Sequence, residues 1–284
     1  MTTDKGTDTR PAPVVRPLPP WAAGGIGVAA TVALWWLAAA TVLSGVGAAA
    51  DGTGGAVPTP GEVVRQLAGD GAGFYWPNLA VTVAEASAGY FWGNIAALLL
   101  AGSVLVVPAL ERLVTQLAVI SYCLPIVAIG PLAFIVIGSP ARGEASGTAV
   151  LLAGISVFFT TVVGALSALK SADPASLDLV AVYGGGRFKQ LVKVQLISAL
   201  PGILTVLKIA VPAAVLGAVL GEYVGGVDRG IGPALVNAQQ NLEIARAWGV
   251  ALVAGLLAGA GYGVFAAIAR FVTPWSAGRQ GGSR

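Results

Sequence analysis

Few side chains in this chain could do chemistry, and three of them lie inside long apolar stretches: Glu85, Lys208 and Glu222. Burying a charge in a membrane is costly, so such residues usually pair with one another or line the path of an ion or substrate. The chain has no histidine and a single cysteine, Cys123, which also lies in an apolar run. Histidine metal sites, imidazole proton relays and nucleophile pairs with histidine are therefore excluded, and no intrachain disulfide can form. We predict no catalytic residue and no metal site.

The three intramembrane charges are candidates for a substrate pathway, and each has an alternative. Glu85 could instead lie within about two turns of the outer surface and be wetted there. Lys208, roughly three turns inside its apolar stretch, could attract an anionic substrate, pair with a carboxylate, or extend back to the cytoplasmic surface. Glu222 lies at the outer end of the same stretch, where it is better placed to hold the following loop, residues 225–245, than to contact cargo.

The sequence lacks a phosphate-binding loop. Such a loop needs Gly-x4-Gly-Lys-Ser/Thr, whose lysine reaches the phosphates of the nucleotide. The glycine-rich segment at residues 52–55 has no lysine. We therefore predict that the chain binds no ATP and holds no cofactor of its own.

Composition indicates a membrane protein. Hydrophobic residues make up 56% of the chain and charged residues only 10%, whereas a soluble domain has about 25% charged residues. The apolar runs are long and do not alternate with polar residues, which argues against strands. The net charge of +3 is too small to suggest nucleic-acid binding. The predicted fold class is all-α, a polytopic membrane protein.

Six apolar stretches are each long enough to cross about 30 Å of hydrocarbon. They cover residues 21–45, 78–107, 113–138, 147–169, 196–224 and 246–272. A cleaved signal peptide is the alternative for the first stretch, although its apolar length is roughly twice that of a signal core. Pro125 and Pro131 should kink the third stretch. Gly255, Gly259 and Gly263, spaced four apart in the last, would allow close helix contact.

The remaining segments are expected to be tails and loops. Residues 1–20 are polar and proline-rich and are predicted to be a disordered tail. Residues 46–77 are predicted to be an outer loop with a short amphipathic piece at 62–67, and residues 225–245 a second irregular loop. Residues 273–284 form the C-terminal tail.

The distribution of cations predicts the orientation, because cytoplasmic loops carry an excess of lysine and arginine. With the N-terminus inside, the outer segments hold only Arg65, Arg142, Arg229 and Arg246. The cytoplasmic segments then hold Lys5, Arg10, Arg16, Arg112, Lys170, Arg187, Lys189, Lys193, Arg270, Arg279 and Arg284. Both termini and residues 171–195 are therefore predicted to be cytoplasmic.

The stretch 171–203 is the one long polar interruption in the second half of the chain. Asp173 can cap a helix, and Pro174 suits its first position because proline has no N–H to satisfy. An apolar stripe follows at helical spacing, formed by Leu177, Val180 and Ala181. The glycines at 184–186 should end the helix, because glycine adopts left-handed backbone angles without steric cost. Three cations come next, Arg187, Lys189 and Lys193. We interpret this two-helix element as a docking device.

These residues resemble the coupling loop of permease subunits of type I ABC importers, which runs Glu-Ala-Ala, three residues, Gly, and further on Leu-Pro. Asp178-Leu179-Val180 stands at the Glu-Ala-Ala, Gly184 matches the glycine, and Leu200-Pro201 matches the Leu-Pro. Asp178 keeps the carboxylate, while the next two residues are bulkier than alanine. Further segments are similar to the branch that serves nitrate, sulfonate, taurine and related small anions or heterocycles: Leu124-Pro125, residues 155–169 and 171–174, Gly221-Glu222 and Gly230-Ile231-Gly232.

The resemblance implies a permease domain over residues 21–272, in which the loop 171–195 couples the chain to an ATPase subunit. It assigns ATPase coupling to Asp173, Pro174, Leu177, Asp178, Ala181, Gly184, Gly185 and Arg187. It further implies a second copy of the chain, two cytoplasmic ATPase subunits that hold ATP and Mg²⁺, and an extracytoplasmic binding protein that delivers a small solute. The complex would sit in the cell membrane. This chain would itself be no enzyme.

Two other functions remain open from the residues alone. An ion-coupled secondary transporter could use Glu85 and Lys208 directly, but such carriers often contain an inverted repeat with matching broken helices, and none is visible here. A non-transporting membrane scaffold would need no structured docking loop. Copurification with an ATPase would support the importer, and transport by this chain alone would support the secondary transporter.

Overall fold

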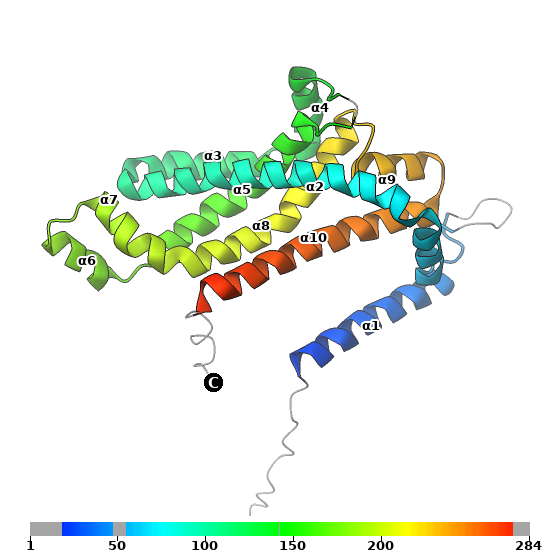
Figure 1. Ribbon diagram of the computed structural model, residues 1–284, viewed down its shortest axis with the longest axis horizontal. Coiled ribbons are helices and arrows are strands. Elements are labelled where there is room, and N and C mark those ends of the chain that lie inside the picture. The colour runs from blue at the N-terminus through cyan, green and yellow to red at the C-terminus, as the bar shows by residue number, and fades with distance from the viewer. Residues whose placement is uncertain (1–18, 48–54, 142, 275–284) are drawn as a thin grey trace, which may run out of the picture. The chain divides into compact units, whose positions relative to one another are not determined.

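The computed structural model describes residues 19–47, 55–141 and 143–274, and every regular element in those ranges is helical (Figure 1). The chain divides into two compact units, residues 1–62 and residues 63–284. The predicted all-α fold class is confirmed. The predicted tails, 1–20 and 273–284, lie almost entirely outside the described residues.

The first unit contains helix α1, Pro20–Ala40. Proline begins the helix, as suits a residue without an N–H. The helix is apolar on all sides and nearly all its described side chains are exposed, which suits a helix surrounded by lipid. It ends at Ala40, five residues before the predicted end of the first span, and turns occupy the residues up to 47.

Helix α2, Pro60–Val106, shows that the predicted outer loop at 46–77 was wrong in its second part. The helix starts at a capping box that the sequence prediction missed. The Thr59 backbone N–H donates to Glu62 Oε2 at 2.8 Å, and the Glu62 N–H donates to Thr59 Oγ1 at 3.4 Å. This reciprocal pairing satisfies N–H groups that a helix start leaves free. Gly71, with φ of 65°, interrupts the helix.

The predicted third span is two helices rather than one kinked helix. Helix α3, Glu111–Cys123, and helix α4, Ile126–Ile137, meet at an angle of 95°. The break lies at Leu124, which is extended with ψ of 124° because the following residue is Pro125. Pro131 lies inside α4 without ending it. A short 3₁₀ turn, Pro108–Leu110, precedes α3.

The second half of the chain alternates long and short helices. They are α5 (Gly147–Lys170), α6 (Pro174–Val182), α7 (Arg187–Gln190), α8 (Leu196–Val224), α9 (Ile231–Gln240) and α10 (Ile244–Val272). A π-helical turn, Leu191–Gln195, joins α7 to α8 without a break. The predicted irregular loop at 225–245 was wrong, because α9 occupies its centre.

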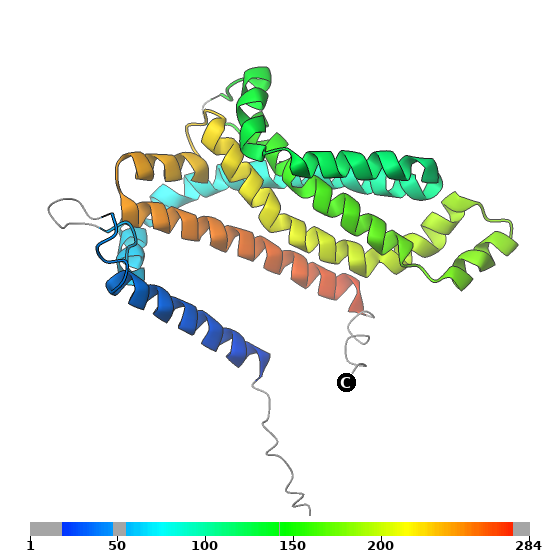
Figure 2. The ribbon, with the colours of Figure 1, turned by 180° about the vertical axis from the view of Figure 1, so that it is seen from behind.

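Helices α2, α5 and α8 pack closely because small residues line their contacts. A Cβ atom on Gly217 of α8 would lie 2.7 Å from Ala153 Cα of α5. A Cβ on Gly93 of α2 would lie 2.6 Å from the Gly154 carbonyl oxygen of α5. Such contacts let two backbones approach without a hydrophobic driving force between helices. Helix α10 lies along α8 and α9 (Figure 2).

The glycine stripe predicted to bring α10 close to another helix makes no such contact with the residues that the structure describes. Gly255, Gly259 and Gly263 have no neighbouring atom within 4 Å of a Cβ position. Gly261 and Gly249 of α10 do pack: a Cβ at Gly261 would lie 2.6 Å from Val211 of α8, and one at Gly249 would lie 3.2 Å from the Tyr75 hydroxyl of α2. Among the described residues, five helices are long and apolar enough to cross a membrane, or six if the bent pair α3 and α4 forms one span.

Candidate functional site

The docking element predicted at residues 171–195 is a hairpin of α6 and α7. Asp173 caps α6: its Oδ1 accepts the Ala175 N–H at 3.4 Å, and its Oδ2 accepts the Ser176 hydroxyl at 3.1 Å. Pro174 is the first helical residue. The predicted helix start is confirmed, and it depends on residues within one turn of each other.

Glycine closes the hairpin as predicted. Gly184 has φ of 74°, which only glycine adopts freely. The Gly185 N–H donates to the Val180 carbonyl at 2.8 Å. The return leg is tied to the first helix, because the Gln190 side-chain amide donates to the Leu177 carbonyl at 3.0 Å. The hairpin is thus one ordered unit.

The hairpin presents apolar side chains that no other described residue covers. No residue of α6 is buried. Val182 and Tyr183 are 82% and 83% exposed, and Phe188 is 65% exposed. Helices usually bury such residues, and a group of them on a polar loop marks an interaction surface. We call Leu179, Val182, Tyr183 and Phe188 the hairpin face.

All the predicted coupling residues lie in this hairpin. Leu177 and Gly185 are half-buried within it, and the others are exposed: Asp173, Pro174, Asp178, Ala181, Gly184 and Arg187. The structure places α6 and α7 at one end of α5 and α8, and α9 at the other end (Figure 1). Their role in coupling stays a prediction.

The predicted pathway residues do not gather in one place. Glu85 and Glu222 are 0% and 2% exposed and lie together in a polar cluster between α2, α5, α8 and α9. The alternative of a wetted Glu85 is therefore wrong. Lys208 is half-buried, with its ammonium 5.2 Å from the centre of the Tyr262 ring on α10. It lies about 20 Å along α8 from Glu222, at 1.5 Å per residue.

Glu222 holds the segment 225–245, as its alternative interpretation predicted. Its Oε2 accepts the Gly232 N–H at 2.6 Å, and its Oε1 accepts the Thr82 hydroxyl at 2.5 Å. Thr82 Oγ1 in turn accepts the Ile231 N–H at 2.9 Å. The free N–H groups at the start of α9 are satisfied in this way by side chains of α8 and α2.

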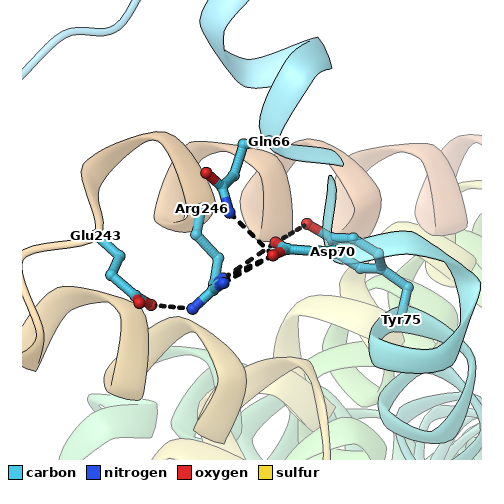
Figure 3. Close-up of polar contacts among 5 residues, drawn as sticks. All are labelled: Gln66, Asp70, Tyr75, Glu243 and Arg246. Carbon is cyan, nitrogen blue, oxygen red and sulfur yellow. Dashed lines mark hydrogen bonds and ion pairs between the residues drawn. The ribbon is translucent and has the colours of Figure 1, made fainter. Parts of the chain in front are cut away.

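A second polar cluster was missed from the sequence (Figure 3). Arg246 at the start of α10 forms a two-point ion pair with Asp70 of α2. Its Nη2 lies 2.7 Å from Oδ1 and its Nε lies 3.0 Å from Oδ2. Glu243 also pairs with Arg246. Gln66 and Tyr75 each donate a hydrogen bond to Asp70, at 2.9 and 3.3 Å. Asp70 and Arg246 are 176 residues apart, so no local pattern could reveal their pairing.

Breaking this ion pair should destabilise the chain. Arg246→Met would leave the Asp70 side chain, only 5% exposed, without its counter-charge. We expect the free energy of unfolding to fall by about 3 kcal/mol, measured by thermal unfolding in detergent. Lys170→Met is the matched control, because its ion pair with Glu111 is about half exposed and should be worth less than about 1 kcal/mol. If Arg246→Met lowers the free energy of unfolding as little as Lys170→Met does, Asp70 needs no partner.

Comparison with known proteins identifies the family. Residues 93–277 match the family described as binding-protein-dependent transport system inner membrane component. The chain is 30% identical over 187 residues to a probable ABC transporter permease protein of Haemophilus influenzae, covering 66% of this chain and 74% of that protein. It is 27% identical over 176 residues to the formylaminopyrimidine transport permease protein ThiX of Halalkalibacterium halodurans, covering 62% and 68%.

The chain belongs to the family of binding-protein-dependent transport system inner membrane components. It is thus a multi-pass membrane subunit of an ABC transporter, a non-catalytic class that works with ATPase and substrate-binding components. An ion-coupled secondary transporter is not favoured. The small-anion branch is not singled out, because the ThiX relative is named for formylaminopyrimidine. Within the described ranges, no group of three or more cysteine, aspartate or glutamate side chains could hold a metal ion.

Proposed function

We propose that the chain forms the translocation pathway of an ATP-driven importer for a small solute delivered by an extracytoplasmic binding protein. Two copies of the chain would each bind one cytoplasmic ATPase subunit through the α6–α7 hairpin, and ATP and Mg²⁺ would bind to those subunits. The observation that carries this proposal is the capped, glycine-closed hairpin whose apolar face is uncovered.

The hairpin is connected so that it can transmit a movement. Helix α7 continues through the π-helical turn into α8. Helix α8 packs against α5 at Gly217 and Gly221, where a Cβ atom would lie within 2.7 Å of the α5 backbone. A displacement of α6 by an ATPase subunit would therefore move α5 and α8 together. Rigid-body movement of this kind is how two halves of a transporter open alternately to either side.

The proposed homodimer is supported by the number of spans, since five or six would make half of a two-part pathway. Helices α3 and α4 carry many exposed apolar side chains that a second copy or lipid would cover, among them Tyr122, Leu132, Ile135 and Val136. The cation distribution supports cytoplasmic termini and a cytoplasmic hairpin.

The proposed solute is a small anion such as a sulfonate or nitrate. Lys208 supports an anion, because a half-buried ammonium in a membrane helix attracts negative charge. The name of the ThiX relative supports a formylaminopyrimidine instead. Uptake of labelled sulfonate, nitrate and formylaminopyrimidine by the complete complex, with and without Lys208→Met, distinguishes these. We expect anion uptake that falls at least about tenfold in the variant.

The importer itself is tested by ATPase activity in lipid nanodiscs. A variant with Gly184→Pro and Asp178→Arg should bind the ATPase subunits weakly or leave their activity unresponsive to binding protein. Proline fixes φ near −65°, whereas Gly184 has φ of 74°. Gly138→Pro is the control, because Gly138 has φ of 84° and open space around it but lies between α4 and α5; this variant should keep its ATPase subunits.

Two outcomes would reject the proposal. If stimulation and uptake are unchanged in the hairpin variant, the hairpin is ordinary solvated surface. If the chain alone transports solute in proteoliposomes without any ATPase subunit, it is an ion-coupled carrier and the charges within its spans drive transport.

A further inference from the structure

Two buried carboxyl groups lie in the polar cluster at the α9 end of α8. Glu85 of α2 and Glu222 of α8 are 0% and 2% exposed, and Thr82, one turn before Glu85 on α2, donates its hydroxyl to Glu222. Each also receives a backbone N–H from the start of a helix. The Ser146 N–H, at the N-cap of α5, donates to Glu85 Oε1 at 2.5 Å, and the Gly232 N–H of α9 donates to Glu222 Oε2.

One oxygen in this arrangement has no donor. Glu85 Oε1 and both oxygens of Glu222 accept hydrogen bonds from Ser146, Thr82 and Gly232. Glu85 Oε2 is buried and accepts none. Two ionised carboxylates are both acceptors and repel each other in a buried site, whereas a single proton turns their contact into a hydrogen bond.

We propose that Glu85 and Glu222 form a proton-binding site, in which Glu85 Oε2 carries the proton and donates it to the Glu222 carboxylate. Glu85 is then a neutral acid and Glu222 an ion. The two helix N-termini carry about half a positive charge each, which matches one negative charge rather than two. The site joins α2, α5, α8 and α9 at one point.

A metal cation fits this site poorly. Three of the four carboxylate oxygens already face N–H or O–H donors, and helix N-termini repel positive charge. Three charged residues are close to this site in the chain: Glu144 precedes Ser146 by two residues, and Asp228 and Arg229 directly precede Gly230. Asp70, Tyr75, Glu243 and Arg246 bond with one another (Figure 3), and Asn78 of α2 accepts the Gly230 N–H at 3.0 Å. Helix α5 contributes the buried Thr148 beside Ser146, and α9 contributes no titratable residue.

The proposal predicts that the two glutamates respond differently to glutamine. Glu85→Gln keeps the arrangement, because its oxygen can accept from Ser146 while its NH₂ replaces the proton toward Glu222. Glu222→Gln places an NH₂ against the donors Thr82 or Gly232. We expect Glu85→Gln to melt within about 2 °C of the parent chain at neutral pH, and Glu222→Gln to melt about 5 °C lower or more.

The pH dependence has a definite sign. The folded chain holds a proton that an unfolded glutamate has already released at neutral pH, so its stability should fall as pH rises. Glu85→Gln has no such proton and should show a flatter dependence between neutral and alkaline pH. Glu111→Gln, at an exposed ion pair, is the control and should keep the slope of the parent chain.

Infrared spectroscopy of the full chain in detergent gives the direct test. At neutral pH we expect the carbonyl band of a buried protonated carboxylic acid, lost in Glu85→Gln and retained in Glu111→Gln. Absence of that band in the parent chain, or equal loss of stability in Glu85→Gln and Glu222→Gln, would overturn the proposal. So would a melting temperature that rises with sodium or potassium concentration in the parent chain but not in Glu85→Gln, because the occupant would then be a metal cation. None of these outcomes depends on the importer function.

Discussion

Replacing Val182 with aspartate should weaken binding of the ATPase subunit about 100-fold. Val182 is 82% exposed at the end of α6, so the change should cost the fold of this chain less than about 1 kcal/mol. In the proposed complex the valine is buried, and the variant loses its hydrophobic contribution and must desolvate a carboxylate. Together these cost roughly 3 kcal/mol, which corresponds to about two factors of ten in affinity. Copurification of the ATPase subunit and titration of its binding in nanodiscs measure the loss.

Leu242→Asp provides the comparison. Leu242 is 80% exposed, but it lies between α9 and α10. Helix α9 is at the end of α8 opposite the hairpin (Figure 1). The Leu242→Asp variant should bind the ATPase subunit as the parent chain does. If both variants bind equally well, the hairpin face does not contact the ATPase. If both bind weakly, added negative charge alone is responsible.

The second large effect is expected inside the bundle. Gly217→Val should lower the free energy of unfolding by about 3 kcal/mol, because added side-chain atoms must enter a space already filled by α5. A Cβ at Gly217 would lie 2.7 Å from both Ala153 Cα and the Leu152 carbonyl oxygen. Both are backbone atoms, so the two helices would have to separate. Thermal unfolding of the purified chain in detergent measures the change.

Gly259→Val is the matched control for this prediction. Gly259 also lies within a membrane-spanning helix, α10, and nothing lies within 4 Å of a Cβ there. The variant should unfold within about 0.5 kcal/mol of the parent chain. Similar losses in both variants would show that the cost comes from valine in a helix rather than from the contact between α5 and α8.

The parts of the fold predicted correctly depend on neighbouring residues. Asp173 and Pro174 start α6 and Gly184 ends it, and each acts through its own backbone angles or a residue within one turn. Apolar length likewise predicted the long helices α5, α8 and α10. The capping box at Thr59 and Glu62 is equally local and was available from the sequence, but the prolines and glycines around it favoured a loop.

The parts predicted wrongly depend on distant residues or on a choice that sequence leaves open. Pro125 could either kink a helix or break it. In the structure the preceding residue, Leu124, has an extended backbone, and the helix is broken there. Helix α9 looked irregular because its start has no capping side chain of its own. The contact between Asp70 and Arg246 forms only when α2 meets α10. The cost of burying a charge in a membrane identified Glu85 and Glu222 as notable residues. It could not show that the two lie in one cluster.

The start of α9 has a consequence for the order of assembly. Its first N–H groups bond to Asn78 and Thr82 of α2 and to Glu222 of α8. Helix α9 has ten residues, and an isolated helix of that length is unstable in water. It should therefore form late in biogenesis, after α2 and α8 have been inserted and have met. A nascent chain arrested after residue 240 has emerged, but before α8 has packed against α2, should still expose this segment to protease.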